Sequence, residues 1–577
     1  MAASPLQQYL ARHQLELVQH SNSNKGRSVV AKQVLHLGSV VITSQPLGTV
    51  ALKAHRHEFC NYCFRKIGSN QPDMSPLQRC SRCKSAYFCD MICFKNAWLS
   101  YHQFVCHPYN GADSDDEEEL DTERDLEMLE RVALNVSRYN KRKAKMEEEG
   151  IHKMQHEDED ESVEATMEAF SSLMDHYHDH PKYLLSQYNE IAETALQRSY
   201  LKDTGLSQQE LVRFLCQFRC NNFAISDEQL FVIGEGTYPV ASLFNHSCRP
   251  NAAVIFDGAL AVVKALENIQ PGDEITLAYV DVAHARPQRK QSLKEKYFFD
   301  CNCGRCTDNN YLGRIDAMLG QEDSIWDRAQ SLLDEDQTRN RLKEIIEQDW
   351  NLEYLTKYFT RRNDNVPDPD KPFNLPVYTH YMLVRLSPYL WAAVDPEIKF
   401  VKPSSIPISQ MRTITEFDDP PAASARPFPG RTYQEILTEA LEIVTSYKAP
   451  KDVVPYRITT LAKATRLFYD ELMANRLRNA TKLAMYIFAQ YAIIYPPYHP
   501  MLAQHLLLLA KTAWNSVIQN ELVTNSRRLE MAQERGIRRW ILLAKHTILC
   551  TFGKQSPLWR EVLELEWVFI REQKLKC

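Results

Sequence analysis

The sequence predicts a multidomain α+β protein, with a β-rich core, a metal-bound finger and an all-α C-terminal region. Three observations carry this prediction: closely spaced cysteine pairs in the first quarter, a hairpin-like stretch at 252–269, and helical periodicity from about residue 313 onward. The 577 residues correspond to about three or four domains, far more than one core needs. Hydrophobic residues at 44% and charged residues at 25% are ordinary globular values, so wholesale disorder and collagen-like repeats are excluded.

The sequence carries no membrane or secretion signal that we can identify. No apolar run approaches the roughly 20 residues of a membrane helix, and the N-terminus lacks a basic segment followed by an apolar one. We therefore expect residence in the nucleus, the cytoplasm or both, without membrane partners. In a reducing compartment, paired cysteines more often bind metal than form disulfides, and this chain has 15 cysteines.

Charge is distributed unevenly along the chain. Residues 113–164 contain 20 acidic and 8 basic side chains, a balance of −12, whereas the whole chain carries −6. Because blocks of like charge repel and lack apolar faces, we interpret most of this stretch as a solvated insertion, a flexible linker with one embedded helix at Leu126–Tyr139. The alternative is an acidic docking surface for basic partners.

Residues 60–106 contain four ligand pairs at spacings of two or three intervening residues. Zn²⁺ prefers thiolate and imidazole, and a closed structural site takes four protein ligands. Seven cysteines and one histidine are enough for two such sites, and the metal would supply much of the folding energy of so short a segment. A disulfide cluster is the weaker alternative in an intracellular chain. The candidate ligands are Cys60, Cys63, Cys80, Cys83, Cys89, Cys93, His102 and Cys106.

A second cluster of motifs follows further along the chain. Residues 245–251 read NHSCRPN, the hairpin-like stretch 252–269 contains the turn signal Asp257-Gly258, and residues 272–280 read GDEITLAYV. Three cysteines then appear within six residues, one short of a tetrahedral site, and Cys248 of the first motif would complete the set. These cysteines are Cys301, Cys303 and Cys306.

The C-terminal half has the periodicity of amphipathic helices. Apolar residues recur at helical spacing over 461–472 and 502–517, and Pro500 stands where a helix would begin. Residues 364–372 and 418–430 are rich in proline and polar residues, and we interpret them as loops around the helical array. The sequence alone supports α-helical hairpins here, without a recognisable repeat consensus.

Together, NHSCRPN, GDEITLAYV and the CxCxxC tail resemble the SET domain of protein lysine methyltransferases. The finger resembles a MYND zinc finger, including Tyr87-Phe88 before Cys89 and Trp98 before His102, so the chain is similar to the SET-and-MYND family. The acidic insertion marks it as a divergent member. The resemblance implies a β-rich SET fold with an inserted MYND finger, a zinc-bound post-SET segment and a tetratricopeptide-like helical C-terminal domain.

The resemblance also divides the chain into six segments. The expected order is the N-terminal part of the SET domain at 1–59, the MYND finger at 60–106, the acidic insertion with a helical SET insert at 107–218, the SET core at 219–283, the post-SET zinc segment at 284–306 and the helical C-terminal domain at 307–577.

Three structural zinc ions are implied by the family pattern, each with four protein ligands. In the finger the two sites interleave, so that alternate pairs share an ion. The implied sets are Cys60, Cys63, Cys89 and Cys93 for the first ion, Cys80, Cys83, His102 and Cys106 for the second, and Cys248, Cys301, Cys303 and Cys306 for the third.

The family pattern implies S-adenosylmethionine as the cofactor. Residues 25–28 read KGRS and resemble the loop that cradles the methionine end of the cofactor, with Ser28 where a second glycine is usual. Without the other motifs this would be an ordinary polar turn. The implied cofactor-binding residues are Lys25, Gly26, Arg27, Asn221, Asn245, His246, Tyr279 and Phe299.

Methyl transfer to a lysine amine needs a neutral, aligned nucleophile in a narrow dry channel more than covalent help from the protein. By resemblance Tyr279 is the catalytic tyrosine, whose hydroxyl can orient the amine, and Tyr297 is the second aromatic of the channel. The alternative for each is a buried structural tyrosine. No general-base carboxylate is evident, and deprotonation through solvent would suffice.

The implied function is therefore methyl transfer from S-adenosylmethionine to a lysine of a histone or non-histone protein. The alternative is a catalytically weak or inactive scaffold that binds protein partners in transcriptional regulation, which Ser28 and the acidic insertion favour. Peptide partners would bind the finger or the helical domain, and we expect a monomer. Direct nucleic-acid binding is disfavoured, because the isoelectric point is about 6.3 and the only short basic run is Lys141–Lys145.

Overall fold

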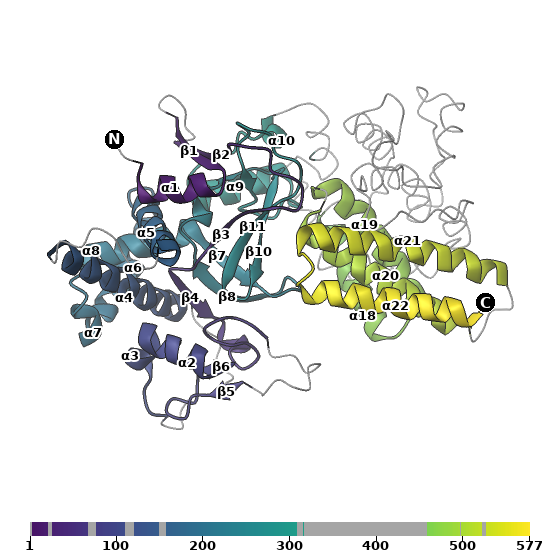
Figure 1. Ribbon diagram of the computed structural model, residues 1–577, viewed down its shortest axis with the longest axis horizontal. Helices are drawn as coiled ribbons and strands as arrows, with labels where there is room; N and C mark the ends of the chain where they lie inside the picture. Colours follow the sequence, from purple (N-terminus) through teal and green to yellow (C-terminus); the bar gives the residue numbers. More distant parts are fainter. Residues whose placement is uncertain are drawn as a thin grey trace. The chain divides into compact units, whose positions relative to one another are not determined.

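The computed structural model describes residues 3–20, 26–66, 77–109, 121–148, 157–307, 316, 458–496, 498–521 and 527–576. They fall into two compact units (Figure 1). The first comprises Met1–Asn245, Ala252–Leu277 and Lys294–Phe299, and the second comprises His246–Asn251, Ala278–Leu293 and Asp300–Cys577. Lys25, the acidic run 113–119 and the loops expected at 364–372 and 418–430 lie outside the described residues. Among the described helices, none combines the length and apolar character needed to cross a membrane.

The first unit contains the β-rich core. One antiparallel sheet has the order β10-β11-β3, formed by Ala252–Asp257, Leu260–Ala265 and Val40–Ser44, and a second has the order β4-β8-β7, formed by Gly48–Ala51, Val232–Thr237 and Asn222–Ser226. Strands β1 (Leu15–Gln19) and β2 (Arg27–Ala31) pair with each other, as do β9 (Asn245–His246) and β12 (Thr276–Leu277). The short 3₁₀ helices are η1 (Lys53–His55) and η3 (Ala241–Leu243).

The hairpin predicted at 252–269 is confirmed as β10 and β11. Asp257 pairs with Leu260, and Gly258 has φ +60°, the left-handed conformation that the turn requires. The tip of this hairpin rests on the finger, because the N–H of Ala259 donates to the carbonyl of Cys63 at 2.8 Å. A methyl group at Gly258 would come within 2.3 Å of that carbonyl oxygen.

The finger is a small irregular module with little secondary structure of its own. It contains β5 (Gln78–Arg79), β6 (Tyr87–Phe88), α2 (Met91–Ala97), the π-helical turn η2 (Trp98–His102) and α3 (Gln103–Val105). Asp90 caps α2, where its carboxylate accepts the N–H of Cys93 at 2.7 Å. This cap fixes the turn on which Cys89 and Cys93 lie.

Helices cover the finger and the sheet of the first unit (Figure 1). Helix α4 packs against β4, η2, α6 and α8, while α1 packs against α5. The bounds are α1 (Pro5–Arg12), α4 (Asp121–Glu148), α5 (Glu157–Ser172), α6 (Lys182–Leu196), α7 (Ser199–Lys202) and α8 (Gln208–Asn221).

The helix expected at Leu126–Tyr139 is confirmed within α4, but the expectation of a solvated linker is wrong for this part of the insertion. Residues 128–134 of α4 are all buried. The charged side chains of this segment are paired rather than solvated: Glu127 accepts from Arg56 at 2.6 Å and from Arg131, and Glu130 accepts from Tyr200 at 3.0 Å. Their partners lie far away in the sequence, which is why the charge count alone suggested solvent exposure.

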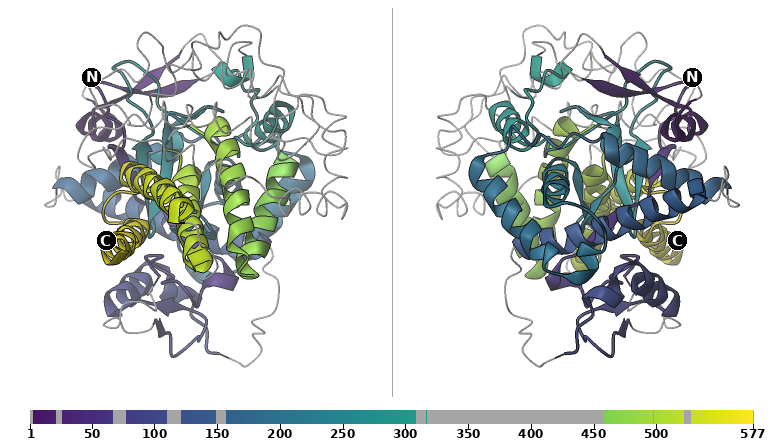
Figure 2. Two further views of the ribbon diagram at one scale, coloured as in Figure 1. Left: turned by 90° about the vertical axis from the view of Figure 1, so that its right-hand side faces the viewer. Right: turned by 90° about the vertical axis from the view of Figure 1, so that its left-hand side faces the viewer.

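The second unit contains the tail segment α10 (Gly304–Thr307) and a helical array. Each array helix packs against the next, as Figure 2 shows, and α20 also packs against α22. The predicted helix start at Pro500 is confirmed, as is the helical character of this region. The helices are α18 (Ile458–Met473), α19 (Leu477–Ile494), α20 (Pro500–Glu521), α21 (Arg527–Thr551) and α22 (Pro557–Lys576); α9 (Arg286–Tyr297) runs from the second unit into the first.

Candidate active site and metal centres

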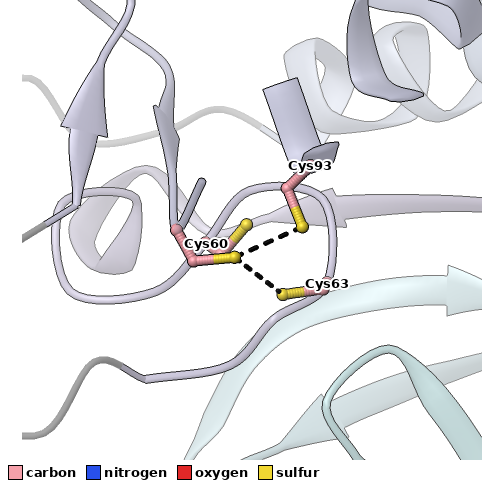
Figure 3. Close-up of side chains that lie close together, drawn as sticks. Cys60, Cys63 and Cys93 are labelled. Carbon is pink, nitrogen blue, oxygen red and sulfur yellow. Dashed lines mark hydrogen bonds between the residues drawn. The ribbon is translucent and has the colours of Figure 1, made fainter. Parts of the chain in front are cut away.

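The finger gathers its eight candidate ligands in two groups of four. Cys60, Cys63, Cys89 and Cys93 form one group, and Cys80, Cys83, His102 and Cys106 form the other, with all donor atoms of a group within 4.8 Å of one another. Figure 3 shows the sulfur atoms of Cys60, Cys63 and Cys93 pointing toward a common centre. These are the interleaved sets that the family pattern implies.

The spacing of these donor atoms fits a tetrahedral ion. A Zn–S bond of about 2.3 Å places two sulfurs of a tetrahedron about 3.8 Å apart. The observed separations are 3.7 Å for Cys63–Cys89, 3.8 Å for Cys80–Cys106 and 3.7 Å between Cys83 Sγ and His102 Nε2. Both groups could therefore hold zinc.

A third group brings the tail of the SET region to the NHSC motif. Cys248 Sγ lies 3.5 Å from Cys306 Sγ and 4.0 Å from Cys301 Sγ, and the backbone N–H of Cys248 donates to Cys303 Sγ at 3.4 Å. The four sulfur atoms lie within 4.8 Å of one another, so this group could also hold a metal ion. Cys248 lies 53 residues before Cys301, and a bound ion would fasten the two segments together.

The third group is flanked by a cluster of one buried aspartate, two buried arginines and the partly buried Arg286. Asp316 accepts from Arg289 at 2.7 and 3.0 Å and from Arg305 at 3.1 Å, and Arg286 approaches it at 3.5 Å. Arg289 also donates to Cys306 Sγ at 3.7 Å, and Arg289, Arg305 and Asp316 are all 0% exposed. Alone, this cluster would carry a charge of +2 in a largely buried position, which is unfavourable.

Metal binding would neutralise this charge. Four thiolates and one Zn²⁺ carry a net −2, and three arginines with one aspartate carry +2. The balance requires all four cysteines to be deprotonated around a divalent cation. The arginine cluster is thus an independent reason, besides ligand spacing, to regard Cys248, Cys301, Cys303 and Cys306 as a metal site.

In the first unit, the candidate cofactor loop is held by Asn245. Its side-chain amide donates to the carbonyl of Arg27 at 2.6 Å and to Glu274 Oε1 at 2.8 Å. Gly26 has φ +65°, which favours glycine, and Ser28 is buried in β2 with its hydroxyl 2.7 Å from His20 Nε2. Ser28 is therefore accommodated in β2, and Gly26, two residues earlier, keeps its left-handed conformation. Lys25 lies outside the described residues.

Asn221, the last residue of α8, is held in a similar way. Its amide donates to the carbonyl of Gln217 at 2.8 Å and of Met174 at 3.2 Å. Because both asparagine amides donate to protein oxygens, the atom that Asn221 and Asn245 can offer to a ligand is the Oδ1 acceptor.

Tyr297 and Phe299 flank a residue with unusual backbone geometry. Phe298 has φ +59°, and its ring packs between His176 at 5.0 Å and His180 at 4.8 Å. Such a conformation is costly for a phenylalanine, and these two rings hold it in place. Burial raises the pKa of Tyr297 to about 12, so its hydroxyl stays protonated at neutral pH.

In the second unit, His246 and Tyr279 lie against each other. Their ring centroids are 5.3 Å apart, and His246 Nδ1 accepts the backbone N–H of Tyr279 at 2.9 Å. The other ring nitrogen, Nε2, lies 3.2 Å from Cys248 Sγ. Burial lowers the pKa of His246 to about 4, so the imidazole is neutral at physiological pH.

The SET domain family model matches residues 26–280, which begin at Gly26, enclose the finger and α4, and end just after Tyr279. The human N-lysine methyltransferase SMYD2 is 30% identical over 285 residues, covering 49% of this chain and 58% of that protein. The Arabidopsis thaliana histone-lysine N-methyltransferase ASHR1 is 29% identical over 284 residues, covering 49% of this chain and 53% of that protein.

Residues 26–280 of this chain are thus a SET domain. The chain spans between half and three fifths of the length of these relatives. The SET domain match covers Asn221, Asn245, His246 and Tyr279, whereas Tyr297, Phe299 and the three tail cysteines lie beyond it.

Several residues of the site were not identified from the sequence. Glu274 stands in the GDEITLAYV motif, yet its bond to Asn245 had no signal of its own. The anchor of Arg27 also comes from far away, since its guanidinium donates to the carbonyl of Ser172 at 3.0 Å and to its hydroxyl at 2.8 Å. Asp316 and Phe298 likewise contact residues that only the tertiary fold brings close to them.

Proposed function

We propose that this chain is a protein lysine N-methyltransferase that uses S-adenosylmethionine and methylates a histone or non-histone protein. The observation that carries the proposal is the SET match over residues 26–280, together with relatives that are named as lysine methyltransferases. When bound, S-adenosylmethionine supplies an activated methyl group, and the protein supplies position and electrostatics.

The two asparagine side chains support binding of the methionine end of the cofactor. The Oδ1 atoms of Asn221 and Asn245 are acceptors, since both amide groups donate to protein oxygens. An acceptor suits the cofactor's ammonium group better than its carboxylate. We therefore assign these asparagines to the ammonium, and Gly26 and Arg27 to close backbone approach, with Lys25, His246 and Phe299 completing the cofactor site.

The two tyrosines support a lysine channel. We assign Tyr279 to orienting the lysine amine and Tyr297 to the channel wall; the phenol of Tyr297 stays protonated because burial raises its pKa. The lysine nitrogen must lose its proton to water before it can attack, and desolvation favours the neutral amine. Tyr279 would then hold the neutral amine in line with the methyl group that bound S-adenosylmethionine supplies, S-adenosylhomocysteine would be the leaving group, and the methylated amine would lose its second proton to water.

We infer that the three cysteine-rich groups hold structural zinc. Four donors in each group leave no position for a reacting water, and their spacing suits a tetrahedral ion. As in the family pattern, the finger and a tetratricopeptide-like helical domain would bind peptide partners, the protein would act as a monomer, and it would reside in the nucleus, the cytoplasm or both.

The scaffold alternative rested on Ser28 in place of a glycine and on the acidic insertion. Ser28 lies inside β2 with a hydrogen-bond partner, and Gly26 keeps its left-handed conformation. The serine therefore gives no reason to expect a lost cofactor site, and the enzyme is the better supported function.

The test is methyl transfer from radiolabelled S-adenosylmethionine to purified histones and to whole-cell extract. We expect a labelled band with the wild-type protein that disappears with Asn245→Ala because the cofactor is no longer held. Tyr279→Phe should lose turnover but bind the cofactor with wild-type affinity in calorimetry. Tyr469→Phe, an exposed tyrosine of α18, is the matched control and should keep full activity. The proposal fails if no protein is labelled while the wild type binds cofactor and contains three zinc ions.

A further inference from the structure

The imidazole of His246 bridges two segments of the second unit. Nε2 lies 3.2 Å from Cys248 Sγ, and Nδ1 lies 2.9 Å from the backbone nitrogen of Tyr279. A backbone N–H can only donate, so Nδ1 is the acceptor and the ring proton is on Nε2. That proton points at the sulfur of Cys248, and sulfur accepts it best as a thiolate.

Cys248 provides a rigid end for this bridge. The residue is 0% exposed, its N–H donates to Cys303 Sγ at 3.4 Å, and its sulfur belongs to the four-cysteine group. In metal sites, hydrogen bonds around the ligands fix their orientation. Here the orientation is passed on to residues outside the metal site. The fixed sulfur of Cys248 orients the imidazole of His246, and the imidazole orients the segment that begins at Tyr279.

A second connection joins the same two segments. The Arg305 guanidinium donates to the carbonyl of Cys248 at 3.2 Å and to the carbonyl of Val282 at 2.8 Å. Val282 lies three residues after Tyr279, and Asp316 holds Arg305 in place. The segment Tyr279–Val282 is thus fastened to Cys248 at both of its ends.

We propose that the His246 side chain is a positioning residue that links the metal-bound thiolate of Cys248 to the backbone of Tyr279. The tail metal site then orders the tyrosine of the active site, in addition to holding the tail. The inference rests on the proposed function only where it treats Tyr279 as the catalytic tyrosine. The contacts of His246 with Cys248 and Tyr279 do not depend on whether the protein is active.

Two conservative variants separate the two ends of the bridge. In His246→Asn, the amide oxygen takes the place of Nδ1 and can still accept the N–H of Tyr279, but the shorter side chain no longer reaches the sulfur of Cys248. In His246→Gln, the longer amide can still donate to Cys248, but the acceptor for Tyr279 is lost. His246→Ala lacks both contacts.

Hydrogen exchange at the Tyr279 amide, followed by mass spectrometry, reports the first end. Loss of a hydrogen bond worth about 1 kcal/mol or more speeds exchange roughly tenfold. We expect slow exchange in the wild type and in His246→Asn, and fast exchange in His246→Gln and His246→Ala.

In cobalt-substituted protein, the thiolate-to-Co²⁺ absorption band tests the other contact, between the side chain at position 246 and Cys248. That band should be unchanged in His246→Gln and shifted in His246→Asn and His246→Ala.

Turnover supplies the third readout. A positioning role predicts that kcat falls at least tenfold in His246→Gln and recovers in part in His246→Asn. Both variants keep the backbone of His246 and replace its ring by an amide, so the KM for the cofactor should differ little between them. Equal exchange at the Tyr279 amide in all four proteins, or a loss of cofactor affinity with unchanged kcat in His246→Ala, would overturn the proposal. A wild type that methylates nothing would defeat the proposed function, whereas the exchange and cobalt measurements would still decide whether the bridge exists.

Discussion

The hydroxyl of Tyr495 donates a hydrogen bond of 3.0 Å to Oδ1 of Asp281, 214 residues earlier in the chain. Tyr495 ends α19 of the helical array, and Asp281 follows Tyr279 by two residues. Burial and the neighbouring carboxylate raise the pKa of Tyr495, so the phenol remains a donor. The same carboxylate oxygen accepts the N–H of Ala283 at 2.9 Å. The helical array is therefore bonded to the segment that carries the proposed catalytic tyrosine.

Tyr495→Phe removes this bond while keeping the ring. We expect the free energy of unfolding to fall by about 0.5–1.5 kcal/mol, because the variant loses the hydrogen bond between the buried phenol of Tyr495 and the exposed carboxylate of Asp281. Urea unfolding followed by circular dichroism measures this change. If the bond also orders the segment after Tyr279, kcat should fall severalfold with unchanged zinc content.

The control for this variant is Tyr469→Phe, which removes a hydroxyl from a tyrosine that is 41% exposed on α18. A substitution at such a position should change stability by no more than about 0.5 kcal/mol. Equal effects of the two variants would mean that the bond to Asp281 contributes nothing specific.

Asp316→Asn tests the charge balance around the tail metal site. The variant leaves three arginines opposite the tetrathiolate with only a neutral amide between them, and breaking a buried ion pair typically costs about 3–5 kcal/mol. We expect lower stability and faster release of one zinc ion to a chelating dye. Asp257→Asn is the matched control, because its ion pair with Arg65 is 69% exposed on both sides and should be worth less than about 1 kcal/mol. Unaltered zinc release in Asp316→Asn would contradict the charge argument.

Local signals account for what the sequence predicted well. The hairpin at 252–269 has its own turn dipeptide, Pro500 marks a helix start within one residue, and the metal groups depend on short ligand spacings. The turn and the helix start are decided by residues close together in the chain, whereas each metal group joins short-spaced cysteines to ligands that lie up to 58 residues away. Residues close together also decide the helix inside the insertion, whose leucines and valines recur at helical spacing.

The features that were missed depend on partners far away in the sequence. Glu127 looks like part of an acidic linker until Arg56 is placed 2.6 Å from it. His246 looks like a cofactor ligand alone until the fold sets Cys248 and Tyr279 at its two ring nitrogens. Composition and periodicity contain no information on such contacts, since they arise from tertiary packing.

Zinc content tests the three metal groups one at a time. We expect about three zinc ions per chain by mass spectrometry of the metal, since each group offers four donors. Cys63→Ser, Cys83→Ser and Cys303→Ser should each lower the content by one, because a tetrahedral site loses a ligand. Cys216→Ser is the control, since Cys216 is buried but stands outside the three groups. A full complement of zinc in any of the three ligand variants would contradict the assignment of that group.

His505 makes the stability of the helical array dependent on pH. Its Nε2 donates to the carbonyl of Ala484 at 2.7 Å, and burial lowers its pKa from 6.5 to about 4. Between pH 6.5 and 4 the unfolded chain binds a proton that the folded chain does not, so stability falls as pH falls through this window. The loss should approach about 3 kcal/mol at pH 4.

The variant His505→Gln isolates this effect, because glutamine can donate to the same carbonyl and does not titrate. Urea unfolding at several pH values should show wild-type stability dropping below that of His505→Gln as the solution is acidified. Above pH 7 the difference between the two proteins should be constant. A difference that stays constant down to pH 4.5 would show that His505 does not contribute.

Gly48 and Val132 test whether the insertion helix is part of the core. A methyl group added at Gly48 of β4 would lie 2.8 Å from Val132 Cγ2 of α4. Gly48→Ala should therefore cost about 1–3 kcal/mol through overpacking, and Val132→Ala alone should cost about 1–2 kcal/mol by leaving a cavity. In the double variant the new methyl group fills the space that the valine vacates, so the combined loss should be smaller than the sum. Strict additivity would contradict the contact between Gly48 of β4 and Val132 of α4.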